Sequence, residues 1–383
     1  MIDLLNDDER PLVEAARAFA RQQLLDLDRR CDRDETSICT ALPQLAQMGF
    51  MSLRLPEEYG GLNCRRLLYA AILHELAYAS PSVAVTLSVH NMVGQLLLRF
   101  GSERVKSELL PGWGRAENHG SFAITEADAG SDPGAGSTMA TRDGDEWVIN
   151  GSKMWITSGR EAPWFVVLAQ TRRVEDKDGM CMILVDARQD GFERLEIKGK
   201  MGIRASETFS LHFTDVRAPL DHLLGAEGDG LKLSLVALDG GRIGIAAQST
   251  GIAQACLDEM ISYARQRVQF GQPIAKFQAI QWMIADSQVE LSAAKLLIAR
   301  ACAEAEKDTG FTAAAAKAKL YASEMAGRVA DRAVQVHGGM GYVNDSRVEQ
   351  LYRDARVTRI YEGTSEIQRL VIARELLNSK EKN

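Results

Sequence analysis

The chain has 383 residues, 46% of them hydrophobic and 25% charged, a composition typical of a globular protein with two or three domains. A formal net charge of −7 without a basic run argues against nucleic acid or an anionic membrane surface as the partner. Six cysteines are scattered without metal-ligand spacing or a CxxC pair, so we expect reduced thiols and no metal site. Because we find no signal-like segment, no transit pattern and no apolar run that approaches a membrane span, we expect a soluble, cytoplasmic protein.

The N-terminal third has the periodicity of helices. Asn6 and Glu9 resemble a capping box ahead of a long apolar face. Further helices are predicted over 42–48, 67–76 and 83–100. His90 and Asn91 are embedded in the last of these, where a core or cleft position is more common than a catalytic one. We expect residues 1–118 to form an N-terminal helical domain.

The middle third has short β-type runs bounded by Gly, Asp and Ser. The run 147–156 contains Asn150 followed by Gly151, a dipeptide typical of a hairpin turn, so we expect the chain to turn there. Further strands are predicted over 164–170, 180–185 and 209–213. We expect residues 119–223 to form a middle β domain.

Helical periodicity returns in the last third, over 231–267, 277–307 and 312–336. We therefore expect residues 224–383 to form a C-terminal helical domain. The whole chain is predicted to be an α+β protein, with helices, a β domain and helices in that order.

A carboxylate near the C-terminus is placed where a loop meets a helix. Glu362 precedes Gly363, which permits a tight turn, and Thr364 or Ser365 can cap the helix that the following apolar residues predict. The free N–H groups of a helix start can bind an anion or a polar ligand, so a ligand and this carboxylate could meet here. Taken alone, the stretch is explained more simply as a glutamate in an ordinary capped turn.

Two stretches further upstream change this interpretation. The glycine-rich segment 335–342 and the segment 352–356, together with 359–369, resemble the C-terminal signature of the acyl-CoA dehydrogenase family, flavoproteins that desaturate acyl-CoA thioesters. The resemblance extends over essentially the whole chain and is closest to the short-chain, butyryl-CoA type. It implies an N-terminal helical domain, a middle β domain and a C-terminal helical bundle.

The resemblance implies that Glu362 removes the α-proton of an acyl-CoA, that flavin N5 accepts the β-hydride and that a trans-2-enoyl-CoA is the product. Burial is expected to raise the pKa of this carboxyl toward the working pH. Some family members carry the base directly before the arginine that corresponds to Arg242, where this chain has Gly241, which favours Glu362. The expected substrate contacts are Ser131, Asp239, Arg242, Tyr361 and Gly363.

The resemblance also implies FAD as the cofactor. Segments 122–132 and 153–159 are similar to the two flavin motifs of the family, in which Trp155 packs on the ring and Thr157 donates near N5. Segment 265–273 is similar to one that reaches the FAD of a neighbouring subunit. The residues expected to bind FAD are Phe122, Ile124, Thr125, Gly130, Ser131, Trp155, Ile156, Thr157, Arg267, Phe270, Gln278, Gln335, Val336, His337, Gly338, Gly339, Thr364, Ser365 and Glu366.

The partners that the resemblance implies are an acyl-CoA substrate, an electron-transfer flavoprotein as electron acceptor, and further copies of the chain in a homotetramer. Two other functions remain open. One is an oxygen-using flavin oxidase of the same fold, and the other is a CoA-binding protein that keeps the fold without turnover. The sequence does not specify the acyl group.

Overall fold

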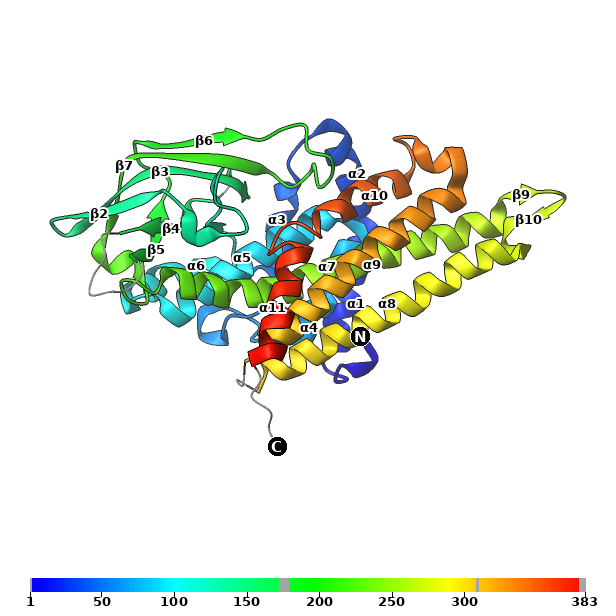
Figure 1. The fold of residues 1–383 in the computed structure, drawn as a ribbon, viewed down its shortest axis with the longest axis horizontal. Coiled ribbons are helices and arrows are strands. Elements are labelled where there is room, and N and C mark those ends of the chain that lie inside the picture. The colour runs from blue at the N-terminus through cyan, green and yellow to red at the C-terminus, as the bar shows by residue number, and fades with distance from the viewer. Residues whose placement is uncertain (1, 161, 172–178, 308–309, 379–383) are drawn as a thin grey trace.

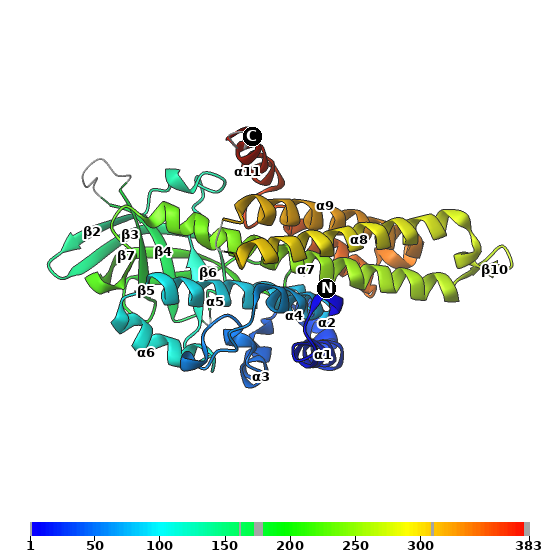
Figure 2. The ribbon, with the colours of Figure 1, turned by 90° about the horizontal axis from the view of Figure 1, so that it is seen from below.

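The computed structural model of the chain describes residues 2–160, 162–171, 179–307 and 310–378. Figure 1 shows a β-sheet at one end of the long axis and a layer of long helices that extends from it to the other end. In Figure 2 the first helices and the last one lie on opposite sides of this layer. The observed order of helices, sheet and helices confirms the α+β fold predicted from the sequence.

The N-terminal part of the chain is helical. Its α-helices are α1 Arg10–Phe19, α2 Leu25–Asp34, α3 Leu42–Gln47, α4 Arg66–Ala79, α5 Pro81–Phe100 and α6 Glu103–Trp113. Helix α1 begins later than predicted, because Glu9 and not Asn6 is its N-cap residue. The Asn6 N–H still donates to the Glu9 carboxylate at 2.8 Å, so one half of the predicted capping box is present.

Helix α5 is the core helix of this part. Its first turn is fixed by Pro81 and by Ser80 Oγ, which accepts the Val83 N–H at 3.0 Å. By length and composition α5 could span a membrane, so the expectation that no apolar run approaches a span is wrong. However, 72% of its most apolar window is buried inside the protein, where α5 packs against α4, α7 and β1. Its apolar composition is therefore that of a helix covered on most sides.

The middle part is a sheet with the strand order β6-β7-β3-β2-β4-β5-β8, and β1 pairs in parallel with β4. The strands are β1 Gly120–Ala123, β2 Met139–Asp143, β3 Glu146–Thr157, β4 Trp164–Gln170, β5 Met180–Asp186, β6 Phe192–Glu196, β7 Thr208–Pro219 and β8 Leu223–Leu224. Strands β4 and β5 are buried on both faces, because this part of the sheet has protein on each side.

The predicted turn at Asn150 and Gly151 is wrong. The chain turns at Gly144, which has φ +60° and joins β2 to β3, and β3 continues straight through Asn150 and Gly151. At Gly151 the pairing of β3 with β7 shifts register, and a Cβ there would lie 2.7 Å from Thr138 Cα. Gly151 thus permits a β-bulge and a close approach of two strands, which are the other usual reasons for a glycine inside a strand.

The C-terminal part is a helical bundle. Its elements are α7 Gly230–Gln266, the short strands β9 Val268–Gln269 and β10 Gln272–Pro273, α8 Gln278–Ala305, α9 Thr312–His337, α10 Arg347–Val357 and α11 Ser365–Asn378. Helix α7 has 37 residues and is therefore about 55 Å long. It starts against the sheet, packs on α4, α5, α8 and α9, and ends at the β9–β10 hairpin at the far end of the molecule (Figure 1).

The expected domain limits differ in how well they fit these elements. The limit at 118/119 lies in the connection between α6 and β1. The limit at 223/224 divides β8, whose Leu224 pairs with Met182 of β5 and so belongs to the sheet. We propose that the second limit lies in the connection 225–229 before α7.

Candidate active site

Glu362 lies in a strained loop between α10 and α11. Its φ is +53° and that of Gly363 is +87°, so two successive residues adopt the left-handed conformation. For a residue other than glycine this conformation is uncommon and costs of order 1 kcal/mol, so the surroundings must hold it in place. Gln368 Nε2 donates to the carbonyl oxygens of Glu362 at 3.0 Å and of Gly363 at 2.9 Å, and Lys319 Nζ donates to the Gly363 oxygen at 2.7 Å.

The start of α11 supports the same loop. Thr364 Oγ1 accepts the Ile367 N–H at 3.3 Å, so Thr364 is the N-cap residue of α11. It was one of the two residues predicted for this role. Ser365 is buried and its hydroxyl donates to Glu324 at 2.7 Å instead. Glu366 is exposed on the first turn of the helix. The backbone around Glu362 is thus held from both sides.

Glu362 is half-buried as a whole residue, and its carboxylate is incompletely hydrogen-bonded. Its Oε2 is inaccessible and has no hydrogen-bond partner among the described residues. Burial raises the pKa of Glu362 to about 7, although the charges of Arg242 and Lys319 act to lower it. The high pKa expected from the sequence is therefore present. Such a carboxyl can gain or lose a proton near neutral pH, which is what a general base requires.

Gly241 of α7 provides the space for this carboxylate. A Cβ at position 241 would overlap Glu362 Oε2, so any side chain there would displace the carboxylate. Glycine at position 241 therefore leaves room for the Glu362 carboxylate. From the sequence, this position was notable only because it lacks the glutamate of some family members. Tyr361 completes the wall beside it, because its hydroxyl donates to Gln248 and its ring packs against the apolar cluster between α5, α7 and the sheet.

Asp239 and Arg242 lie inside the protein close to Glu362. Arg242 is 3% exposed, and its Nη1 donates to Asp239 Oδ1 at 2.5 Å. The other oxygen of Asp239 accepts from Thr312 Oγ1 at 2.5 Å. Both residues were predicted to contact the CoA part of the substrate, and this role stays a prediction. In the structure, Arg242 supplies a buried positive charge on the wall that faces Glu362.

A second group of predicted residues meets on the sheet. Trp155 has φ +64° and an indole that is 56% exposed, and the Met154 N–H donates to the Thr125 oxygen at 2.9 Å. This bond places the two predicted flavin motifs side by side. Thr157, Ser131 and Gly130 are accessible, and a Cβ at Gly130 would meet no atom within 4 Å. An accessible aromatic face beside open backbone fits the planar ring of FAD. Phe122 and Ile124 pack in the apolar cluster that the sheet shares with α5 and α7, and Ile156 packs in a separate cluster of strand residues.

An ion pair that sequence reasoning missed joins these two motifs. Lys153 Nζ donates to Glu126 Oε1 at 2.8 Å and to the Ile124 oxygen at 3.1 Å. Glu126 also accepts the N–H groups of Ser137 at 2.6 Å and Thr138 at 3.0 Å. Burial alone would raise the pKa of Glu126, but these hydrogen bonds lower it to about 2. The signal in the sequence that could have indicated this ion pair is one glutamate and one lysine, each inside a motif of mostly apolar or turn-forming residues.

The geometry agrees with what comparison with known proteins shows. Residues 6–117, 121–216 and 228–377 match, in order, the N-terminal, middle and C-terminal domains of acyl-CoA dehydrogenases. The chain belongs to the acyl-CoA dehydrogenase family. It is an acyl-CoA dehydrogenase, an oxidoreductase that acts on CH–CH groups, and the resemblance seen in its motifs is confirmed.

Individual relatives cover nearly the whole chain. The mitochondrial short-chain specific acyl-CoA dehydrogenase of Mus musculus is 41% identical over 377 residues, which cover 98% of this chain and 91% of the relative. The butyryl-CoA dehydrogenase structure from Megasphaera elsdenii has 36% identity and a TM-score of 0.94, with 98% and 99% of the two chains covered. A structure described with the electron transferring flavoprotein of Acidaminococcus fermentans has 36% identity, a TM-score of 0.95 and the same coverage.

The remaining predicted FAD residues of this dehydrogenase lie far from Trp155 in the single chain. Arg267, Phe270 and Gln278 are exposed at or beside the β9–β10 hairpin, at the opposite end of the molecule from the sheet (Figure 1). At the end of α9, Gln335, Gly338 and Gly339 are exposed, whereas Val336 and His337 are buried. The His337 ring stacks on Tyr263 with centroids 4.2 Å apart. One chain therefore presents two separate groups of predicted flavin contacts.

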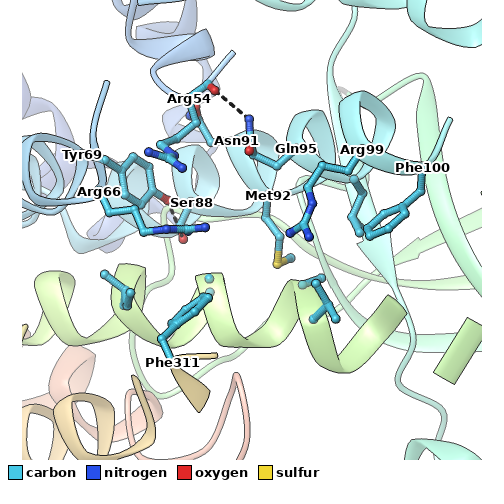
Figure 3. Close-up of a pocket in the computed structure, with 16 residues that line it drawn as sticks. Arg54, Arg66, Tyr69, Ser88, Asn91, Met92, Gln95, Arg99, Phe100 and Phe311 are labelled. Carbon is cyan, nitrogen blue, oxygen red and sulfur yellow. Dashed lines mark hydrogen bonds between the residues drawn. The ribbon is translucent and has the colours of Figure 1, made fainter. Parts of the chain in front are cut away.

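A pocket adjoins Gly241 on the side of α4 and α5 (Figure 3). Its volume is about 650 Å³, including the space open to solvent at its mouth. Asn91 lines it and so has the cleft position, one of the two positions expected for this pair of residues. His90 does not, because it is fully buried, stacked on Trp113 with centroids 4.7 Å apart, and its Nε2 is 3.2 Å from the Trp113 oxygen. His90 thus has the core role that was the more common one for such a residue.

Proposed function

We propose that this chain catalyses the FAD-dependent α,β-dehydrogenation of an acyl-CoA to a trans-2-enoyl-CoA, with Glu362 as the base that removes the α-proton. The observation that carries the proposal is the buried Glu362 Oε2, which has no hydrogen-bond partner among the described residues and belongs to a carboxyl with a pKa of about 7. A structural carboxylate at this depth is normally paired or fully hydrogen-bonded. A carboxylate that lies against Gly241 and has an unpaired oxygen is instead suited to accept a proton from a bound ligand.

The residues around Glu362 orient the substrate and the proton transfer. The left-handed backbone at Glu362 and Gly363, held by Gln368 and Lys319, fixes where the carboxylate points. We propose the peptide N–H of Glu362 as a donor to the thioester oxygen, where negative charge develops as the α-proton leaves. The proton moves from the α-carbon to Glu362, whose pKa allows it to hold that proton near neutral pH.

FAD, when bound, supplies the acceptor for the β-hydride. Thr125, Trp155 and Thr157 would hold its ring against the sheet, and the ion pair of Glu126 with Lys153 would keep the two motifs aligned. Because Arg267 and Phe270 lie at the β9–β10 hairpin, at the opposite end of the molecule from the sheet (Figure 1), we propose that they contact the FAD of another copy of the chain. A homotetramer and a soluble, cytoplasmic location belong to the same proposal.

Anaerobic mixing with acyl-CoAs tests the function. The purified protein is expected to be yellow, to lose its flavin absorbance when mixed with butyryl-CoA, and to recover it when an electron-transfer flavoprotein is added. Steady peroxide formation without an added acceptor would identify an oxidase instead. A colourless protein that binds CoA but bleaches no added FAD would identify a binding protein.

Sedimentation of the Arg267→Ala variant tests the shared flavin. We expect it to lose FAD and to dissociate, because a planar guanidinium suited to pyrophosphate is removed from the hairpin. Arg300→Ala, exposed on α8 and outside segment 265–273, is the control and is expected to keep both FAD and assembly. A wild-type monomer that retains FAD would contradict a shared site.

A further inference from the structure

The pocket beside Gly241 contains more positive charge than an acyl chain made only of methylene groups needs. Arg54, Arg66 and Arg99 all line it, and Figure 3 shows them entering from the side of α4 and α5 above the wall formed by α7. We propose that this pocket binds an acyl chain that ends in a carboxylate, so that the substrate is a dicarboxylic acid linked to CoA through one of its carboxyl groups. This inference rests on the proposed function of Glu362.

The charges in the pocket are poorly compensated by the protein. Arg66 and Arg99 form no ion pair among the described residues, and the buried Nε of Arg66 has no hydrogen-bond partner there. Their guanidinium groups instead lie over aromatic rings, that of Arg66 4.8 Å from the Phe311 centroid and that of Arg99 5.1 Å from the Phe100 centroid. Flat, weakly hydrated guanidinium groups over rings keep their donors available to a carboxylate.

Arg54 is the third charge and is only partly neutralised. Its Nη1 donates to the Cys64 oxygen at 2.6 Å and is 3.7 Å from Glu306, whose other contact here is with the Arg66 N–H at 2.7 Å. Glu306 thus lies near the guanidinium group of Arg54, while its contact with Arg66 is to the backbone N–H. Burial and the charge of Arg54 both lower the pKa of Arg66, and the charge of Glu306, which acts to raise it, does not offset them. A bound anion would remove this repulsion.

The pocket and the proposed base share a wall. Gly241 lines the pocket, and Glu362 Oε2 lies directly against the same glycine. From Gly241 to Val236, at the other end of the wall, α7 rises by about 7.5 Å. Met92, Leu96 and Ala237 provide an apolar lining for methylene groups. A Cβ built at Gly240, the residue next to Gly241, would lie 3.9 Å from Arg66 Nη1, so an acyl chain with its α-carbon at Glu362 would meet this guanidinium within a few carbons.

The phosphates of CoA are the other possible source of an anion. They are separated from the thioester by the long pantetheine arm, whereas this pocket lies next to the residue that acts on the α-carbon. Position therefore favours the acyl carboxylate. The experiment below separates the two sources, because a phosphate contact affects every CoA thioester and is absent from a pantetheine thioester.

Matched pairs of substrates with equal carbon number test the inference. We expect kcat/KM for glutaryl-CoA to exceed that for valeryl-CoA at least tenfold, and adipyl-CoA to exceed hexanoyl-CoA in the same way. Arg66→Met removes the charge and keeps an apolar side chain of similar length, so it should lower kcat/KM for the dicarboxylyl substrates at least tenfold. It should leave valeryl-CoA unchanged or improve it. The control is Arg30→Met, because Arg30 is exposed on α2 and is absent from the pocket.

Three results would overturn the inference. One is a wild-type preference for valeryl-CoA that Arg66→Met and Arg99→Met leave unchanged, in which case the proposed dehydrogenation still stands. The second is an equal loss by Arg66→Met on both CoA thioesters that disappears with pantetheine thioesters, which would assign the arginines to phosphate. The third is the absence of oxidation of every thioester by FAD-loaded protein, which would remove the proposed function as well. FAD absorbance and gel filtration of each variant show that it is folded.

Discussion

Two glutamates of this protein, the buried Glu126 and the half-buried Glu362, differ in how their carboxylates are hydrogen-bonded. Glu126 accepts hydrogen bonds from Lys153, Ser137 and Thr138, and its pKa falls to about 2. Glu362 has an oxygen with no partner among the described residues, and burial raises its pKa to about 7. The first carboxylate is charged near neutral pH and holds two segments of the chain together. The second can change its protonation state within the range in which an enzyme works.

The comparison shows that burial by itself does not decide what a carboxylate does. Desolvation acts on both groups in the same direction, so the difference comes from the donors that the fold supplies. Near Glu362, the donors of Gln368 and Lys319 are used on backbone oxygens and not on the carboxylate. The loop is thus fixed while the side chain stays available. The following substitutions test this difference, from the largest expected effect to the smallest.

Glu362→Gln should have the largest effect on turnover. Glutamine keeps the size of the side chain but cannot accept the α-proton at neutral pH, so we expect the rate of anaerobic flavin bleaching by acyl-CoA to fall by about 10³ to 10⁴. FAD content and acyl-CoA binding should remain. Glu375→Gln on the exposed face of α11 is the control, with an unchanged rate. Near wild-type bleaching by Glu362→Gln would sink the assignment.

The same variant has a predicted signature in stability. Because the folded-state pKa of Glu362 is raised from 4.5 to about 7, its contribution to stability is present below pH 4.5 and is lost as the pH rises through 7. Glu362→Gln in the FAD-free protein should therefore melt at a higher temperature than the wild type at pH 8. The two proteins should melt alike near pH 4.5. A constant difference across this range would mean that the carboxyl is not perturbed.

Breaking the other carboxylate site should affect stability and not chemistry. Glu126→Gln or Lys153→Met leaves one buried charge without its partner, which should cost about 3 to 5 kcal/mol in the free energy of unfolding and weaken FAD retention. The double variant should recover part of that loss. Glu117→Gln, which breaks an ion pair of similar length on the surface, should change stability by less than about 1 kcal/mol. Chemical denaturation and the flavin-to-protein ratio measure both effects.

Sequence reasoning identified the fold and the position of Glu362, because helix periodicity, strand runs and the Glu362-Gly363 junction are local signals. It misplaced the turn of β3, since Asn150 and Gly151 are equally compatible with a bulge, and only the pairing with Thr138 and β7 decides between them. It also could not see contacts between distant segments. Lys319 lies on α9 and donates to a carbonyl oxygen 44 residues away. In the sequence it could be recognised only as a lysine on the same helix face as the buried alanines of α9.

Gly241→Ala tests the space around Glu362. A Cβ at this position overlaps Glu362 Oε2, so the carboxylate must turn away from the α-carbon of the substrate. Because small misplacements of catalytic groups are costly, we expect the bleaching rate to fall by about tenfold to a hundredfold. Gly240→Ala is the matched control, because its nearest neighbour would be Arg66 Nη1 at 3.9 Å. Both variants gain helix propensity of about 1 kcal/mol, so a loss of stability does not explain a difference in rate. Equal rates for the two would show that the contact is harmless.

Lys319→Met should have the smallest effect, mainly on pH dependence, because Gln368 still donates to the Glu362 and Gly363 oxygens and holds the loop. Glu362 must be deprotonated to accept a proton, so the rate rises with pH through its pKa of about 7. The Lys319 charge lowers that pKa, while burial lowers the pKa of Lys319 itself to about 8, so the lysine acts mainly below pH 8. Removing it should move the rising limb of the rate–pH profile up by about one unit, with similar plateaus at pH 9. The control is Lys317→Met on the same helix, which should leave the rising limb of the rate–pH profile in place. If Lys319→Met also leaves this limb unmoved, the bond of Lys319 to the Gly363 oxygen matters only for structure.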